Sequence, residues 1–357
     1  MRMQQRTKMQ FSTLTNWQPK LVLLLFASLS FVLSAGAVSA PLSIMTFNVE
    51  NLFDAKDDLG KSDETYLPAT KKKSSAHIAK CRKISVRRWR DQCLNWDWSE
   101  AVVNQKLEHV SEAIKQINDG RGPDIIALQE VENVGILERL RSDYLKGLGY
   151  QAAVLIEGRD RRGIDVAFLS KLTVIEAKLH PIIFPKSLKR RVGDTRPLLE
   201  ATFELPNGEK LTGFSVHFPA PYHPTEMREV AYTTLNSIVE SLPEDRAVFA
   251  AGDFNTTLEE DTKKDMLSRW VRPIWQVAHD LCKACPGTSY YPPKDDWSFL
   301  DMVLWRQTLG WEVTGSFLAN NTPEQVRSNG TPRRFQLPEV SGVSDHWPLV
   351  MLVETSP

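Results

Sequence analysis

Residues 246–255 read RAVFAAGDFN, an apolar run that ends at the polar residues Asp253 and Asn255. A short apolar run bounded by polar residues is typical of a buried strand. We therefore predict a strand here, with Asp253 and Asn255 at its carboxyl end. Further strands are predicted at 42–49 (LSIMTFNV), 124–131 (DIIALQEV), 163–170 (GIDVAFLS), 198–205 (LLEATFEL), 210–218 (KLTGFSVHF), 297–305 (WSFLDMVLW) and 344–353 (SDHWPLVMLV).

An apolar stripe at three- and four-residue spacing predicts a helix that begins near Asp97, where Glu100 would complete a capping box. The stripe consists of Val103, Leu107, Val110, Ile114 and Ile117. Two further helices are predicted at 134–147 and 225–241. Because strands follow one another with few helices between them, we expect an α/β fold with mixed sheets packed face to face and helices outside.

The first 40 residues are typical of a secretory signal peptide. Residues 1–20 hold four basic residues and no acidic one, residues 21–33 are apolar, and small residues follow up to Ala40. We predict cleavage after Ala37 or Ala40 and export to the periplasm or the extracellular space. The alternative is an uncleaved anchor helix over 21–40, which is just long enough to span a bilayer. After cleavage, no membrane span is expected.

The remaining residues, 41–357, show no repeat, low-complexity tract or flexible linker, which favours a single domain. The whole chain has 44 basic and 44 acidic residues, so loss of residues 1–40 leaves 40 basic against 44 acidic. A mildly acidic protein of this kind binds a polyanion only through a local basic patch.

Export gives the four cysteines a predicted role in disulfides. Cys81 and Cys93 bracket a short segment, and Cys282 and Cys285 lie three positions apart, so we expect two local disulfides. The other two pairings, a four-cysteine metal site and free thiols remain open.

Polar residues fall at the ends of the predicted strands. Asp301 is different because it interrupts the apolar run 297–305, and a buried carboxylate needs a partner, for which a histidine is suited. Carboxylate and amide oxygens suit Mg²⁺ or Ca²⁺, and a histidine titrates near neutral pH, so the set predicts metal-assisted attack on a phosphate ester. The residues at or just past a carboxyl end are Asn48, Glu130, His217, Asp253 and Asn255, and Asp345 and His346 open the last run.

Six ordered motifs across residues 42–353 resemble the endonuclease/exonuclease/phosphatase superfamily, and in particular an exported bacterial-type member. They are IMTFNVENLFD, PDIIALQEVEN, FSVHFPAP, AGDFNTT, FLDMVLW and VSDHWPLV. The resemblance implies a deoxyribonuclease I-like fold, a four-layer α/β sandwich of two mixed β-sheets flanked by helices.

The resemblance also implies a role for each polar residue. Glu130 would be the principal metal ligand, with Asn48 and Asp345 nearby. Asp253 and Asn255 would orient or deprotonate the attacking water and hold the phosphate. Asp301 would orient and charge-stabilise His346, while His217 would contact the scissile phosphate. Whether Asp253 or His346 is the general base stays open.

Arg196, in DTRPLLE, stands where relatives carry an arginine that contacts the phosphate, and a guanidinium matches phosphate geometry. A structural ion pair is the alternative. For Asp165, a pair with Arg162 is expected.

The sequence departs from a minimal member of the superfamily by an insertion at about 54–97. Within it, residues 71–90 contain nine basic residues, Trp89 and no acidic residue. Such a segment, closed by Cys81 and Cys93, is suited to follow a nucleic-acid backbone. The alternative is a solvated, partly disordered surface insertion. Further basic clusters lie at 159–162 and 186–191.

These features predict a metal-dependent phosphodiester hydrolase, namely an exported nuclease that acts on DNA. Mg²⁺ is the expected metal, with Mn²⁺ or Ca²⁺ as alternatives, and no obligate protein partner is evident. One alternative is a phosphoesterase for inositol phosphates or sphingomyelin-type lipids, because the fold and site do not select the substrate. A second alternative is a non-catalytic binding module, which would lack some of the ligands.

Overall fold

The structure, a computed structural model, describes residues 41–151 and 153–355. The predicted signal peptide therefore lies outside the described residues. Within them, no helix is long and apolar enough to cross a bilayer.

The first of two large sheets has six strands in the order β13-β14-β1-β2-β4-β3. Strands β1 and β2 run parallel, and the other neighbours are antiparallel, so the sheet is mixed. Its strands are β1 (Leu42–Leu52), β2 (Ile125–Val131), β3 (Val154–Leu155), β4 (Asp165–Ser170), β13 (Trp311–Leu318) and β14 (Leu349–Thr355).

The second large sheet also has six strands, in the order β5-β6-β7-β8-β12-β9. Only β7 and β8 run parallel, so this sheet is mixed as well. Its strands are β5 (Thr173–His180), β6 (Leu198–Glu204), β7 (Lys210–His217), β8 (Ala247–Asp253), β9 (Trp275–Val277) and β12 (Asp301–Arg306). A separate hairpin joins β10 (Ser289–Tyr291) and β11 (Asp296–Ser298).

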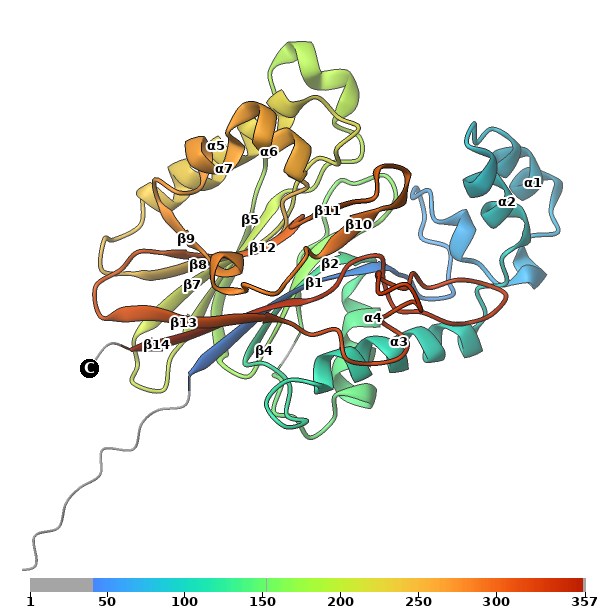
Figure 1. The fold of residues 1–357 in the computed structure, drawn as a ribbon. Helices are drawn as coiled ribbons and strands as arrows, with labels where there is room; N and C mark the ends of the chain where they lie inside the picture. The colour runs from blue at the N-terminus through green and yellow to red at the C-terminus, as the bar shows by residue number, and fades with distance from the viewer. Residues whose placement is uncertain (1–40, 152, 356–357) are drawn as a thin grey trace, which may run out of the picture. The chain divides into compact units, whose positions relative to one another are not determined.

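Figure 1 shows the sheets with helices outside them. Successive side chains of a strand point to opposite faces of its sheet, so each strand contributes to two layers. Ile44 of β1 packs with Phe203 and Phe249 of the second sheet in the core between the sheets. The next residue, Met45, packs on the opposite face with Leu107 of a helix. The outer helices are α3 (Glu100–Lys115) and α4 (Val134–Arg139) on the first sheet, and α5 (Thr225–Glu240), α6 (Leu258–Lys264) and α7 (Met266–Trp270) beside the second. The predicted sandwich of two mixed sheets flanked by helices is therefore confirmed.

Three predicted boundaries are wrong. Asp97 is not the cap of α3, which begins after Ser99, because its carboxylate accepts a hydrogen bond from the Ala69 N–H (2.7 Å) instead. The run 297–305 breaks into β11 and β12, since Phe299 and Leu300 form a connection between them. Strand β14 begins only at Leu349, so residues 344–348, which were predicted to belong to it, lie in the preceding loop. The same loop contains the cis peptide bond between Leu337 and Pro338.

The insertion is helical rather than disordered. Helices α1 (Ser75–Arg82) and α2 (Arg87–Asn95) are joined by the Cys81–Cys93 disulfide, and Cys282 pairs with Cys285. Both local pairings are therefore those expected. His77, which was not among the predicted residues, lies one turn before Cys81 with its Nε2 3.0 Å from the carbonyl oxygen of Cys93.

Lys106 of α3 is fully buried and ties this helix to the loop 334–346. Its Nζ donates to the Val343 carbonyl (2.5 Å) and lies 4.9 Å from the centre of the Phe335 ring. Burial lowers the pKa of Lys106 to about 8, against the opposing charges of Glu50 and Asp345.

We expect Lys106→Met to lower the free energy of unfolding by about 1–3 kcal/mol, because it leaves the buried Val343 carbonyl without a donor. Urea unfolding measures this change. The matched control is Lys115→Met on the exposed side of the same helix, which should stay within about 0.5 kcal/mol of the parent. Equal losses in the two variants would contradict the assignment.

Candidate active site

Each large sheet contains one parallel pair of strands, β1 with β2 and β7 with β8. The polar residues at the carboxyl ends of these strands lie at one edge of the sandwich. In the second sheet, His217 of β7 is paired in register with Asp253 of β8, which is paired with Asp301 of β12. In the first sheet, β1 and β2 run side by side up to Asn48 and Gln129, where the pairing shifts. A second shift of register, between β2 and β4, falls at Glu130, which has a φ of 64°. Such irregularities change the direction in which a side chain points.

Asp253 lies at the centre of the assembled groups. Its Oδ2 accepts a hydrogen bond from Asn48 Nδ2 (3.1 Å) and lies 3.6 Å from His217 Nε2. Its Oδ1 accepts from the backbone N–H of Asn255 (2.9 Å). His217 Nε2 is in turn 3.9 Å from Glu130 Oε1, so side chains from both sheets form one continuous group.

The predicted pairing of Asp301 with His346 is present. His346 Nδ1 lies 2.7 Å from Asp301 Oδ2, and both residues are buried. Burial by itself lowers the pKa of His346, but the charge and hydrogen bond of Asp301, with Asp253 and Asp345, raise that pKa well above its usual value. The imidazole is therefore charged at neutral pH.

The second histidine, His217, is neutral rather than charged. Burial lowers the pKa of His217 well below its usual value, and the charges of Arg196, Arg162 and His346 lower it further. Burial also raises the pKa of Asp253 to about 7, assisted by Asp301 and opposed by His346. The edge thus holds one charged and one neutral histidine with Asp253 between them.

Asp345 and His346 lie on a loop before β14, and Glu50 anchors that loop. Glu50 accepts hydrogen bonds from Arg334 Nε (2.6 Å) and from the backbone N–H groups of Phe335 (3.3 Å) and Asp345 (3.0 Å). Ser344 Oγ also donates to the Asn48 carbonyl (2.7 Å). Glu50 was not among the predicted site residues, and strand alternation does not indicate it, because the register shifts after Asn48 and Glu50 has a φ of 49°.

The predicted metal ligands lie along this edge. Asn48 bonds to Asp253, Glu130 Oε1 lies 3.9 Å from His217 Nε2, and Asp345 Oδ1 lies 4.0 Å from His346 Nε2. Within the described part of the chain, two groups of His, Cys, Asp or Glu place three ligand atoms within 4.8 Å of one another. One is Asp253, Asp301 and His346 in this site. The other is His77, Cys81 and Cys93, where both sulfur atoms belong to a disulfide.

The donor set fits a hard divalent cation, because it consists mainly of carboxylate and amide oxygens. Asp301 Oδ2 is bonded to His346 and Asp301 Oδ1 is buried without a hydrogen-bond partner among the described residues, whereas the side chains of Glu130 and Asp345 remain 15% and 35% exposed. Glu130 Oε2 is held by the Asn51 N–H (3.0 Å), and Asp345 Oδ2 lies 3.4 Å from Arg334 Nη2. Glu130 and Asp345 are thus the carboxylates that a metal from solvent reaches.

Arg196 is buried in an ion pair, the alternative to phosphate contact. Its Nη1 lies 3.0 Å from Asp160 Oδ2, and its Nη2 donates to the Phe218 carbonyl (3.2 Å). Phosphate contact by Arg196 stays a prediction. The expected pair of Asp165 with Arg162 is wrong, because Asp165 accepts from the Gly158 N–H (2.9 Å) and Arg162 lies beside Asp160 instead.

Two mixed sheets flanked by helices, with carboxylates and histidines at their shared edge, define a protein of the deoxyribonuclease I-like class. Residues 45–346 match the model of the Endonuclease/Exonuclease/phosphatase family, and the chain belongs to this family. Family members are typically metal-dependent phosphoester hydrolases. No curated protein sequence matches the chain significantly.

Solved structures share the fold at low sequence identity. TDP2 of D. rerio, complexed with a single strand DNA product, is 14% identical, with a TM-score of 0.54 over 88% of this chain and 99% of that one. A family protein from Bacteroides thetaiotaomicron is 15% identical, with a TM-score of 0.55 over 89% and 99%. One from Bacteroides vulgatus is also 15% identical, with a TM-score of 0.54 over 88% and 99%.

Proposed function

We propose that the protein is an exported, metal-dependent nuclease that hydrolyses DNA by attack of water on the scissile phosphate. The observation that carries this proposal is the continuous group at the sheet edge, in which Glu130, His217 and Asp253 adjoin the Asp301–His346 pair. Export rests on the sequence of residues 1–40 and agrees with the two disulfides.

Each side chain has a role that its environment supports. Charged His346, held by Asp301, stabilises negative charge on the phosphate or donates a proton to the leaving oxygen. Asp253, with a pKa near 7, is suited to accept the proton of the attacking water. Mg²⁺ held by Glu130, Asp345 and Asn48 would supply Lewis acidity at the phosphate.

Arg162 is a further group for the phosphate that the sequence analysis did not select. Its side chain is 42% exposed, unlike that of Arg196; its charge lowers the pKa of His217, and the charges of Asp160 and Glu130 raise its own pKa. A guanidinium beside the metal ligands is suited to bind a phosphate oxygen.

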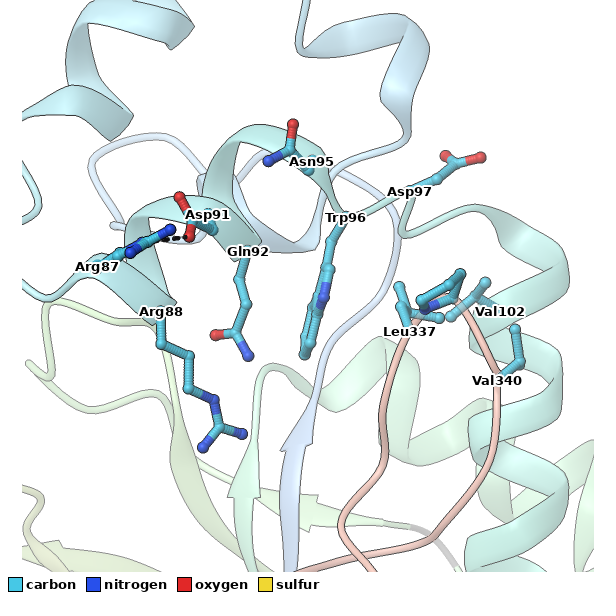
Figure 2. A pocket seen from close by; sticks show the side chains of 11 residues that line it. Arg87, Arg88, Asp91, Gln92, Asn95, Trp96, Asp97, Val102, Leu337 and Val340 are labelled. Carbon is cyan, nitrogen blue, oxygen red and sulfur yellow. Dashed lines mark ion pairs between the residues drawn. The ribbon is translucent and has the colours of Figure 1, made fainter.

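The substrate class is inferred from a groove of about 1050 Å³ between the insertion and the loop 334–346. Figure 2 shows Arg88, Gln92 and Trp96 extending from one side of α2 into the hollow, with Leu337 and other apolar side chains opposite. Leu337, Pro338 and Val340 of this apolar wall belong to the same loop that carries Asp345 and His346. A strand of nucleic acid that leaves the active site along this loop meets an aromatic ring and a basic residue, the combination that binds bases and phosphates.

We expect Arg88→Gln to weaken DNA binding and to reduce the slope of log K against log salt by about 0.7–0.9. Fluorescence anisotropy at several salt concentrations measures both. The matched control is Arg121→Gln, because exposed Arg121 precedes β2 at the end of that strand opposite Glu130. An unchanged slope in Arg88→Gln would show that the groove does not bind the backbone.

The substrate class itself is tested by incubating the mature protein with plasmid DNA, RNA, sphingomyelin and an inositol polyphosphate in the presence of Mg²⁺. We expect cleavage of the plasmid. Cleavage of only the lipid or the inositol phosphate would reject the nuclease assignment in favour of a phosphoesterase, and no cleavage of any of them would favour a binding module.

A further inference from the structure

Two buried carboxylates that the active site does not use lie near the start of the insertion and just after β2, and the charge of one acts on the other. Asp63 and Glu132 are each only 1% exposed. One oxygen of each is bonded to a backbone N–H, at Asp58 (2.8 Å) and at Asp54 (2.7 Å) respectively. The other oxygen of each, Asp63 Oδ1 and Glu132 Oε1, is buried without a hydrogen-bond partner among the described residues.

An unpaired carboxylate oxygen is costly to bury, and the surroundings increase that cost here. The segment 54–64 also contains Asp54, Asp57 and Asp58. Burial raises the pKa of Asp63, the N–H bonds that it accepts oppose this, and the charges of Asp57 and Asp58 raise it further.

The nearby lysines do not neutralise the two unpaired oxygens. Lys56 Nζ lies 3.7 Å from Asp54 Oδ2 on an 80% exposed side chain. Lys61 Nζ is directed to the Asp160 carbonyl (3.4 Å) and to Glu157 (3.8 Å). Lys80 pairs with Glu64. Burial raises the pKa of Glu132 to about 9, the Asp54 N–H opposes this, and the charges of Asp54, Asp58 and Asp63 raise it further. The lysines therefore supply too little positive charge to keep Glu132 ionised at neutral pH, and a divalent cation that binds there would displace its proton.

We propose that the segment 54–64 and Glu132 form a Ca²⁺ site separate from the active site. Asp63 Oδ1 and Glu132 Oε1 are its first ligands, and Asp54, Asp58 and backbone carbonyls of the segment complete it. Ca²⁺ suits such a set because it accepts six to eight oxygen ligands in flexible geometry, whereas Mg²⁺ demands a near-ideal octahedron. In the structure, no three ligand atoms of these carboxylates lie within 4.8 Å of one another. We therefore expect Ca²⁺ binding to move the segment 54–64 closer to Glu132.

The position of the site gives it a structural role. The Asn51 N–H at the end of β1 donates to Glu130, and the Asp54 N–H just after β1 donates to Glu132. The Glu132 N–H donates to the Leu52 carbonyl (3.0 Å). A cation on Glu132 would therefore stabilise both the end of β1, which holds Glu130, and the beginning of the insertion.

The test measures Ca²⁺ binding and the melting temperature of the mature protein after removal of metals. We expect Ca²⁺ to raise Tm by about 3–5 °C at saturation. The double variant Asp63→Asn/Glu132→Gln should lose this rise, while Asp57→Asn, an exposed neighbour in the same segment, should keep it. An undiminished rise in the double variant would overturn the proposal.

A second measurement does not depend on the folding of that double variant. In Glu130→Gln/Asp345→Asn, the predicted active-site ligands are removed and the segment 54–64 is intact. Isothermal titration should still detect one bound Ca²⁺ per chain, with the rise in Tm. Absence of bound Ca²⁺ from this protein would equally overturn the proposal, whatever the outcome for DNA cleavage.

Discussion

His346→Ala is expected to lower the rate of phosphodiester hydrolysis by roughly 10³-fold without unfolding the protein. His346 is the charged imidazole of the edge, since Asp301, Asp253 and Asp345 together raise its pKa. Its removal takes away the group that neutralises charge on the phosphate or protonates the leaving oxygen. The rate is measured under single-turnover conditions on a fluorescent DNA substrate, with the melting temperature as the control for folding.

Asp301→Asn tests whether Asp301 acts on His346 through its charge or only through its position. The amide still occupies the buried position beside His346 Nδ1, but the carboxylate charge is lost. We expect a smaller fall in rate than in His346→Ala and a lower pKa for His346, which NMR titration of the imidazole measures. If His346→Ala retained most of the activity, His346 would not be a catalytic residue.

Glu130→Gln is expected to weaken binding of the catalytic divalent metal by at least about 10-fold, since loss of even an outer partner of a metal ligand has this effect. Hydrolysis should fall with it and recover in part at high metal concentration. The amide oxygen still accepts from the Asn51 N–H, so the end of β1 should be preserved. Titration with Mn²⁺ and the metal dependence of the rate measure the two effects.

The control for this variant is Glu112→Gln, an exposed glutamate on α3 with a side chain that is 57% exposed. It should leave both quantities unchanged. Equal metal affinity in Glu130→Gln and the parent protein would show that the metal is bound elsewhere, for which Asp253, Asp301 and His346 are the group that already converges.

The buried strands could be predicted because both of their faces are covered, so that their sequences are nearly continuous apolar runs. Strand β5 could not, since it is an edge strand with mostly exposed or half-buried residues. Helices α1 and α2 were also missed. Each has a single buried apolar side chain, Cys81 or Cys93, so the disulfide takes the place of an apolar stripe.

The convergence of the site could be predicted in part, because polar residues at the ends of neighbouring strands share an edge. Register then places His217, Asp253 and Asp301 side by side. The contact of Glu50 with Arg334 could not be predicted, since it joins residues 284 positions apart through an irregular loop. The different charge states of the two histidines depend on burial and on neighbours that only the fold defines.

The most direct test of the account is cleavage of plasmid DNA by the mature protein with Mg²⁺, with and without a chelator, beside His346→Ala and Glu130→Gln. We expect the parent protein to cut the plasmid only when the metal is present, and both folded variants to cut it far more slowly. Cleavage that persists in the chelator, or that both variants retain, would contradict metal-dependent hydrolysis at this edge.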